Sequence, residues 1–108
     1  MDMPAATRLG DTTTGVCNLG LPDCPHSRTG TISEVSGDVF INRLGAHRRN
    51  DTGPTNCPHS GTFASTAASA TVFINGRGAV RVGDATTCIV CGQPGSHSSG
   101  SPNVFIGG

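Results

Sequence analysis

The tripeptide Val-Phe-Ile occurs three times in this 108-residue chain. Its copies begin at Val39, Val72 and Val104, so the intervals are 33 residues (39 to 72) and 32 residues (72 to 104). A second phrase, Ala-x-Arg-x-x-Asp, also occurs three times, over residues 6–11, 46–51 and 79–84. An internal repeat constrains the architecture more than any single residue does. Three copies in a chain this short predict approximate threefold symmetry built from one chain.

The repeat favours strands over helices. No window of about a dozen residues free of Gly and Pro has apolar residues at i, i+3, i+4 and i+7. We therefore expect a small all-β, pseudo-threefold fold of three hairpin repeats in a single domain, residues 1–108. The repeat units cover about residues 5–42, 45–75 and 78–108. The expected hairpins pair 31–35 with 38–42, 61–65 with 70–75, and 98–99 with 103–106.

The order of the two phrases predicts how the ends of the chain meet. The chain starts with the Arg-Asp phrase and ends with Val-Phe-Ile, whereas inside the chain Val-Phe-Ile runs directly into the Arg-Asp phrase. Threefold closure therefore requires residues 104–106 to lie beside residues 5–11. The first unit is also longer than the others between Thr12 and Asp23. We interpret this insertion as a surface loop in which Cys17 is a free surface thiol.

The repeat places three possible metal ligands in one slot. His26, His59 and Cys91 each lie 13 residues before a Val-Phe-Ile copy (26 to 39, 59 to 72, 91 to 104). If the three units surround an axis, these side chains converge on it. Zinc prefers four imidazole or thiolate ligands in a tetrahedral site, and His97 in the third unit is the fourth candidate. We therefore expect one Zn²⁺, bound by His26, His59, Cys91 and His97.

Other cysteines and histidines leave alternatives open. Cys88 is a rival fourth ligand because Cys88-x-x-Cys91 has the spacing of zinc knuckles. Cys24 and Cys57 each precede a slot histidine by two residues. They could therefore share the metal or form a disulfide with each other. His47 is interpreted as a surface or packing residue.

Composition limits the core and the range of functions. The chain is 34% hydrophobic with 16 Gly and 7 Pro, and domains with so small a core often need a metal or a partner as a staple. Net charge is zero and no basic run exceeds Arg48-Arg49, which argues against a nucleic-acid partner. The repeated Arg and Asp are expected to pair within turns. Because no catalytic arrangement is legible, we expect no enzyme activity.

The repeated phrases resemble those of the PAAR-repeat family. Residues 4–11 are similar to the family's opening Pro-Ala-Ala-Arg-like phrase with one residue inserted. Residues 72–84 resemble its repeat junction, and residues 99–108 resemble its closing strand. The resemblance covers almost the whole chain. Two departures are the insertion before the first slot histidine and Asn50, which stands where Gly is usual.

The resemblance implies a shape, a metal and a partner. Family members are small β-rich cones with one zinc near the tip, bound by three His and one Cys, which implies His26, His59, His97 and Cys91 here. They cap the trimeric central spike of contractile injection machines, one tip per spike trimer. We therefore expect a structural tip that helps to pierce the target membrane, with transient membrane contact. The alternative is an adaptor that carries separate effectors on a type VI secretion spike.

The phenylalanines of the three Val-Phe-Ile copies are the expected contacts with the spike. Phe40, Phe73 and Phe105 would present a threefold base or the layer just beneath it, with Phe63 in the body. The alternative is that all four form the core. The sequence shows no signal-peptide pattern, so we expect synthesis in the cytoplasm and a final place at the tip of a phage tail baseplate or a type VI secretion spike. Both machines use such a module, so both assignments stay open.

Overall fold

The computed structural model describes residues 4–17, 26–55, 61–89 and 92–107. These residues form strands and turns and no helix, which confirms the all-β class. The strands of the main sheet are β1 (Thr12–Cys17), β2 (His26–Thr31), β5 (Thr52–Pro54), β6 (Thr62–Ser65), β9 (Ala85–Cys88) and β10 (Pro94–His97). Two short hairpins pair β3 (Phe40–Ile41) with β4 (Leu44–Gly45), and β7 (Phe73–Ile74) with β8 (Arg77–Gly78).

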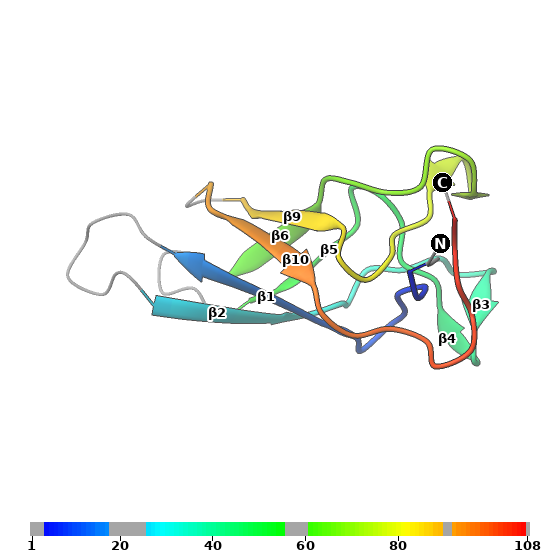
Figure 1. Ribbon diagram of the computed structural model, residues 1–108, viewed down its shortest axis with the longest axis horizontal. Helices are drawn as coiled ribbons and strands as arrows, with labels where there is room; N and C mark the ends of the chain where they lie inside the picture. Colours follow the sequence, from blue (N-terminus) through cyan, green and yellow to red (C-terminus); the bar gives the residue numbers. More distant parts are fainter. Residues whose placement is uncertain (1–3, 18–25, 56–60, 90–91, 108) are drawn as a thin grey trace.

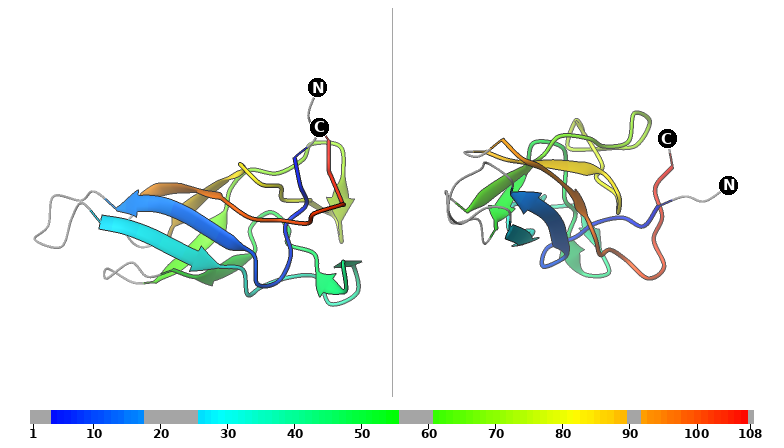
Figure 2. Two further views of the ribbon diagram at one scale, coloured as in Figure 1. Left: turned by 60° about the horizontal axis from the view of Figure 1, so that its bottom comes forward. Right: turned by 60° about the vertical axis from the view of Figure 1, so that its left-hand side comes forward.

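The main sheet curls into a nearly closed barrel (Figures 1 and 2). Its strand order is β2-β1-β10-β9-β6-β5, and all neighbours are antiparallel. A bridge between Thr55 and Gly30 brings the chain after β5 against β2, and the Thr55 hydroxyl donates a 3.3 Å hydrogen bond to the carbonyl of Thr29. The sheet thus consists of three pairs of consecutive strands, β1–β2, β5–β6 and β9–β10, wound around one axis.

The two ends of this barrel differ. In each of the three pairs the first strand ends and the second strand begins at the same end of the barrel, on the left of Figure 1, which we call the distal end. The hairpin β3–β4 and the first and last described residues lie at the other end, which we call the base. Three units that run in the same direction around one axis must bring equivalent residues to the same end, as the repeat predicts.

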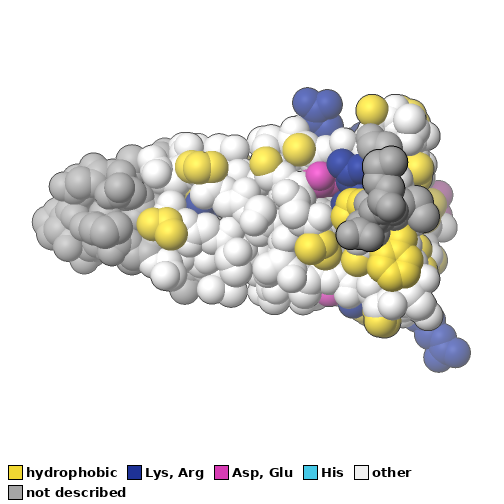
Figure 3. Space-filling view, viewed as in Figure 1, with side chains coloured by type: hydrophobic (Ala, Val, Ile, Leu, Met, Phe, Trp, Pro, Cys, Tyr) yellow, Lys and Arg dark blue, Asp and Glu magenta, His cyan; other side chains and the backbone are white. Residues whose placement is uncertain are grey.

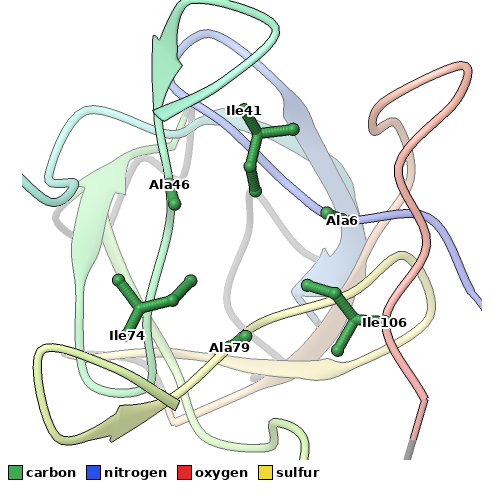
Figure 4. Close-up of a cluster of buried hydrophobic side chains, with 6 residues drawn as sticks. All are labelled: Ala6, Ile41, Ala46, Ile74, Ala79 and Ile106. Carbon is green, nitrogen blue, oxygen red and sulfur yellow. The ribbon is translucent and has the colours of Figure 1, made fainter. Parts of the chain in front are cut away.

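Six small apolar side chains pack around the axis near the base (Figure 4). They occupy two slots of the repeat and are Ile41, Ile74 and Ile106 from the Val-Phe-Ile copies, and Ala6, Ala46 and Ala79 from the Arg-Asp phrases. The alanines are fully buried and the isoleucines are 6–8% exposed. Because the alanine side chain is small, the three backbone segments can approach one another closely at this level of the axis.

The residues that follow these alanines join the three units in a ring of backbone hydrogen bonds. The amide of Thr7 donates to the carbonyl of Val80 (3.1 Å), Val80 donates to His47 (3.3 Å), and His47 donates to Thr7 (3.2 Å). A cyclic set of three such bonds requires three equivalent segments around one axis. The expected pseudo-threefold symmetry is therefore confirmed at the level of the backbone.

Each Arg-Asp phrase closes on itself as a clamp between oppositely charged side chains. The pairs are Arg8–Asp11, Arg48–Asp51 and Arg81–Asp84, with 2.7–3.0 Å between the arginine Nε and the aspartate Oδ2. The same oxygen accepts the backbone N–H of the arginine, and Oδ1 accepts a second guanidinium N–H. These hydrogen bonds raise the pKa of Arg8 and of Arg81. The expected structural role of the pairs is confirmed.

The residue before each clamp aspartate has a left-handed backbone. The φ angle is 88° at Gly10, 72° at Asn50 and 90° at Gly83. Glycine adopts this conformation without steric cost, and asparagine is the side chain that tolerates it best. Asn50 therefore preserves the clamp although glycine is usual at this position.

Each Val-Phe-Ile copy is preceded by a serine turn. Ser36, Ser69 and Ser101 lie three residues before the copies, and each accepts a 2.9 Å hydrogen bond from the backbone N–H of the copy's valine. The predicted hairpins did not include this slot, although serine recurs at the same offset in all three units.

The predicted hairpins are wrong in their pairing. Residues 33–39 form no strand, and residues 98–99 belong to none. β6 lies within the predicted segment 61–65, but it pairs with β5 and β9 and not with residues 70–75. The serine side chain reverses the chain where a hairpin turn was expected, so no ladder forms across it. The insertion in the first unit is also not entirely a loop, because Thr12–Cys17 is strand β1.

The ends of the chain meet as predicted. Phe105 forms an antiparallel bridge with Ala5. The amide of Ala6 donates to the carbonyl of Val104, and the amide of Ile106 donates to the carbonyl of Pro4, both at 2.9 Å. Threefold closure is thus completed through space by the two ends of the chain.

Deletion of residues 104–108 should therefore abolish cooperative folding. It removes Ile106 from the axial core and leaves the buried amide of Ala6 without its acceptor. Thermal unfolding followed by circular dichroism tests this. As matched controls, Ile41→Ala and Ile74→Ala should each cost about 2–5 kcal/mol, as truncations of buried isoleucine do, yet still fold. A truncated chain that melts at the same temperature as the full chain would contradict the closure.

Candidate functional site

The predicted metal ligand His26 begins β2 at the distal end, in register with Cys17 of β1. Alternate residues of β2 and its extension are buried: Ile32, Gly30 and Arg28. This inward series is described as far as Arg28, and the side chain of His26 lies outside the described part of the structure.

Two other predicted ligands, His59 and Cys91, lie outside the described residues. In the chain they fall between β5 and β6 and between β9 and β10. The alternatives Cys24 and Cys57 also lie outside the described residues. In the described part of the chain, no group of three or more His, Cys, Asp and Glu side chains is arranged to hold a metal ion.

His97, the predicted fourth ligand, lies elsewhere. It is the last residue of β10 and pairs with Thr13 of β1, whereas His26 pairs with Cys17, four residues further along the same strand. At about 3.3 Å per residue, this is a separation of about 13 Å along the strand direction alone. His97 is 1% exposed within the middle of the barrel. The structure therefore does not bring His97 to the end where His26 begins its strand.

His97 belongs instead to a buried polar chain with Ser65 and His47. The Ser65 Oγ lies 2.7 Å from Nε2 of His47 and 2.7 Å from Nε2 of His97, and the two imidazole rings are 5.2 Å apart. The ring of Phe63 packs edge-on to His97. The interpretation of His47 as a packing residue is confirmed, since it is fully buried.

The positions of the protons on His47, Ser65 and His97 follow from one backbone carbonyl group. Nδ1 of His47 lies 2.8 Å from the carbonyl oxygen of Glu34, which can only accept, so Nδ1 carries the proton. Nε2 of His47 must then accept from the Ser65 hydroxyl. The serine has no second proton, so His97 donates to it through Nε2. Nδ1 of His97 is left as a buried acceptor with no partner among the described residues.

Burial keeps both histidines neutral. Burial lowers the pKa of His47 below its ordinary value. Burial, with a smaller contribution from the neighbouring His47, lowers the pKa of His97 to about 4. These residues therefore form a structural core layer at neutral pH.

The other candidate residues lie at the base. Phe40 and Phe73 are each 60% exposed and Phe105 is 51% exposed, whereas Phe63 is fully buried in the body as expected. The alternative in which all four phenylalanines form the core is therefore wrong. Figure 3 shows hydrophobic side chains gathered at this end of the molecule. Beneath them, Val39 and Val104 pack against the axial isoleucines.

These features define a class of protein: a small pseudo-threefold β-barrel with an apolar base and with its strand pairs converging on the opposite end. The PAAR motif family matches the chain over residues 23–88 and 56–108, and the chain belongs to this family. Its members are structural spike-tip proteins, so the chain has a spike-tip-related role in contractile injection or type VI secretion. Its general kind of partner is a spike protein.

No curated protein matches the chain significantly. The described residues include no helix long and apolar enough to cross a membrane.

The buried imidazole of His97 should make the fold sensitive to acid. Its pKa is about 4 when folded and about 6.5 when unfolded, so the unfolded chain binds the proton more tightly. Stability is complete above pH 6.5 and falls as pH decreases toward 4, by about 3 kcal/mol. Denaturant unfolding at a series of pH values measures this loss.

His97→Ile is the matched variant for this test. Ile32 occupies the equivalent slot of the first unit, since the amides of Ile32 and His97 donate to the carbonyls of Asp11 and Asp84, respectively. The variant should fold and show a shallower loss of stability between pH 6.5 and 4. An unchanged pH dependence would mean that His97 does not cause the acid sensitivity.

Proposed function

We propose that this protein is a zinc-stabilised tip that caps the trimeric central spike of a contractile tail or secretion machine and helps to pierce the target membrane. One chain would cap three identical spike chains. The observation that carries the proposal is the base, where the exposed phenylalanines Phe40, Phe73 and Phe105 occupy equivalent positions of the three units. An apolar surface of this kind on a small protein marks an interaction site.

The symmetry of the base supports a threefold partner. The three phenylalanines follow Ser36, Ser69 and Ser101, whose turns have the same hydrogen bonds in each unit. The axial isoleucines one residue further along hold them at a common level. A trimer with a blunt end offers three identical surfaces, and each could contact one phenylalanine in the same way. A 1:3 complex would therefore match pseudo-threefold symmetry to true threefold symmetry.

The chemistry of the distal end fits a structural zinc ion. His26, His59 and Cys91 supply imidazole and thiolate donors, the ligand types that zinc prefers. The buried residue Arg28 lies two residues from His26 on β2. A site with four protein ligands is closed and holds no water for catalysis, so the metal would act as a staple. Such a staple would stiffen the end of the molecule that meets the membrane.

One zinc per chain should be present and should be needed for stability. Zinc binding contributes on the order of 10 kcal/mol to the folding of small metal domains. Elemental analysis should find one equivalent of zinc, and a strong chelator should lower the melting temperature sharply. His26→Ala and His59→Ala should lose the metal, whereas His97→Ile should keep it. Purified protein that contains no zinc and is insensitive to chelation would refute the metal proposal.

Replacement of one base phenylalanine with serine should weaken spike binding without loss of fold. The side chains of Phe40 and Phe73 are mostly exposed, so Phe40→Ser and Phe73→Ser remove little from the core. Phe63→Ser is the contrasting control, because Phe63 is buried and its loss should unfold the barrel. Co-purification with the spike protein from the same genome and native mass spectrometry measure binding and stoichiometry. A 1:1 complex would exclude the proposed cap.

A further inference from the structure

One slot at the base holds a different chemical group in each unit. It is the residue two positions after each turn serine and two before each base phenylalanine, and it is Asp38, Thr71 or Asn103. The backbone N–H of each donates to its serine Oγ at 3.1–3.2 Å, and all three residues are exposed. The fold therefore presents a carboxylate, a hydroxyl and an amide at three equivalent places.

The carboxylate of Asp38 is held in one orientation. Nδ2 of Asn75, in the neighbouring unit, donates to its Oδ1 at 3.0 Å, and the hydroxyl of Ser36 lies 2.9 Å from the same oxygen. These contacts, that of Asn75 first, lower the pKa of Asp38, so the group is ionised at neutral pH. No described residue forms an ion pair with it or donates to its Oδ2. One fixed oxygen is thus available to a partner, and a fixed group loses little entropy on binding.

Asn103 is held in the same way. Nδ2 of Asn42 donates to its Oδ1 at 2.8 Å, and the hydroxyl of Ser101 lies 3.2 Å from that oxygen. The Nδ2 atom of Asn103 therefore corresponds to the Oδ2 atom of Asp38. The two side chains have the same shape and the same frame, and they differ in charge.

The first unit also carries an exposed arginine with a left-handed backbone. The β3–β4 hairpin turns through Asn42 and Arg43, with φ angles of 52° and 70° (Figure 1). The β7–β8 hairpin turns through Asn75 and Gly76, with φ angles of 54° and 79°. Glycine adopts this conformation without cost, whereas a long side chain is uncommon there. A residue kept in a strained conformation points to a function, and Arg43 forms no ion pair within the described part of the chain.

We propose that Asp38 and Arg43 form a charged sector of the base that pairs with a cation and a carboxylate of one spike chain and determines which spike the cap accepts. The inference rests on the proposed function and adds the residues that give the contact its specificity. Three exposed phenylalanines suit any blunt apolar trimer, because apolar contacts are not directional. Fixed charges reject a partner that has like charges at the same place.

The symmetry of the partner makes a specific demand on this sector. Three identical spike chains present the same cation three times, so one cation meets Asp38 while the other two meet Thr71 and Asn103. A carboxylate at either of those positions would find the same cation. The number of carboxylates in the slot should therefore change the affinity, whereas the unit that carries the carboxylate should not.

Exchange of the two matched side chains tests Asp38. Asp38→Asn should weaken binding to the trimeric spike protein from the same genome about tenfold in surface plasmon resonance, and it should reduce the salt dependence of binding. The double variant Asp38→Asn, Asn103→Asp moves the carboxylate to the third unit and should restore the affinity to within about threefold of wild type. Thermal unfolding checks that each variant is folded.

Two results would overturn the role of Asp38. One is an Asp38→Asn variant that binds as tightly as wild type. The other is a double variant that binds no more tightly than Asp38→Asn, because identical spike chains must offer the same cation to both positions.

The turn residues give a second test with a different readout. Arg43→Gly relieves the backbone, so it should not lower the melting temperature, yet it should weaken spike binding severalfold. A Cβ on Gly76 would meet no atom within 4 Å, so the double variant Arg43→Gly, Gly76→Arg has room to move the cation to the second hairpin. It should recover the affinity. Unchanged binding by Arg43→Gly, or binding lost together with thermal stability, would remove Arg43 from the charged sector.

The outcomes separate this inference from the proposed function. A wild-type chain that does not bind the spike trimer refutes both. A wild-type 1:3 complex whose affinity is the same in Asp38→Asn and Arg43→Gly keeps the cap and refutes only the charged sector.

Discussion

The clamp between each arginine and the aspartate three residues later is the interaction on which the rest of the structure depends. The carboxylate of Asp51 is completely buried, so it must be fully hydrogen-bonded, and it accepts from Arg48 and from Arg77. Because the backbone N–H of Arg48 binds the same carboxylate, the turn has only one geometry. The alanine two residues before the arginine is thereby directed to the axis.

The clamp also fixes the strands that follow it. The carbonyl of each clamp aspartate accepts an amide from the returning strand of its unit: Ile32 at 2.8 Å, Ser65 at 3.1 Å and His97 at 3.0 Å. One turn therefore sets both the start of an outgoing strand and the end of the strand that pairs with it. Local charge pairing and long-range strand pairing are coupled in this way, and the same coupling occurs three times around the axis.

The sequence predicted the features that repeat and missed those that depend on one unit. Val-Phe-Ile and Ala-x-Arg-x-x-Asp recur in register, so the symmetry, the clamps and the closure of the chain ends could be predicted. The hairpins could not, because Thr52–Pro54 pairs with Thr62–Ser65 across the segment that contains His59, and a serine hydrogen bond reverses the chain where a turn was expected. The place of His97 could not be predicted either, because its counterparts in the other two units, Ile32 and Ser65, differ from it in residue type, so the sequence does not reveal the shared slot.

The interior layers show how one chain can vary a symmetric fold. One slot holds Thr7, His47 and Val80, and the next holds Ile32, Ser65 and His97. A true homotrimer would place three identical side chains in each layer, which for histidine would crowd three imidazoles around the axis. In this chain two histidines and a serine are linked by hydrogen bonds. Val80 and Ile32 fill two of the remaining positions, and the hydroxyl of Thr7 in the third donates a 2.9 Å hydrogen bond to the carbonyl of Val80.

The ring of backbone hydrogen bonds among Thr7, His47 and Val80 has a consequence for assembly. If the chain caps a trimeric spike as proposed, its three nearly equivalent sectors allow three rotational settings, and each setting would make similar contacts. This orientational degeneracy multiplies the number of productive encounters by about three, equivalent to about 0.6 kcal/mol from RT ln 3. The differences among the sectors then decide which contact each spike chain makes.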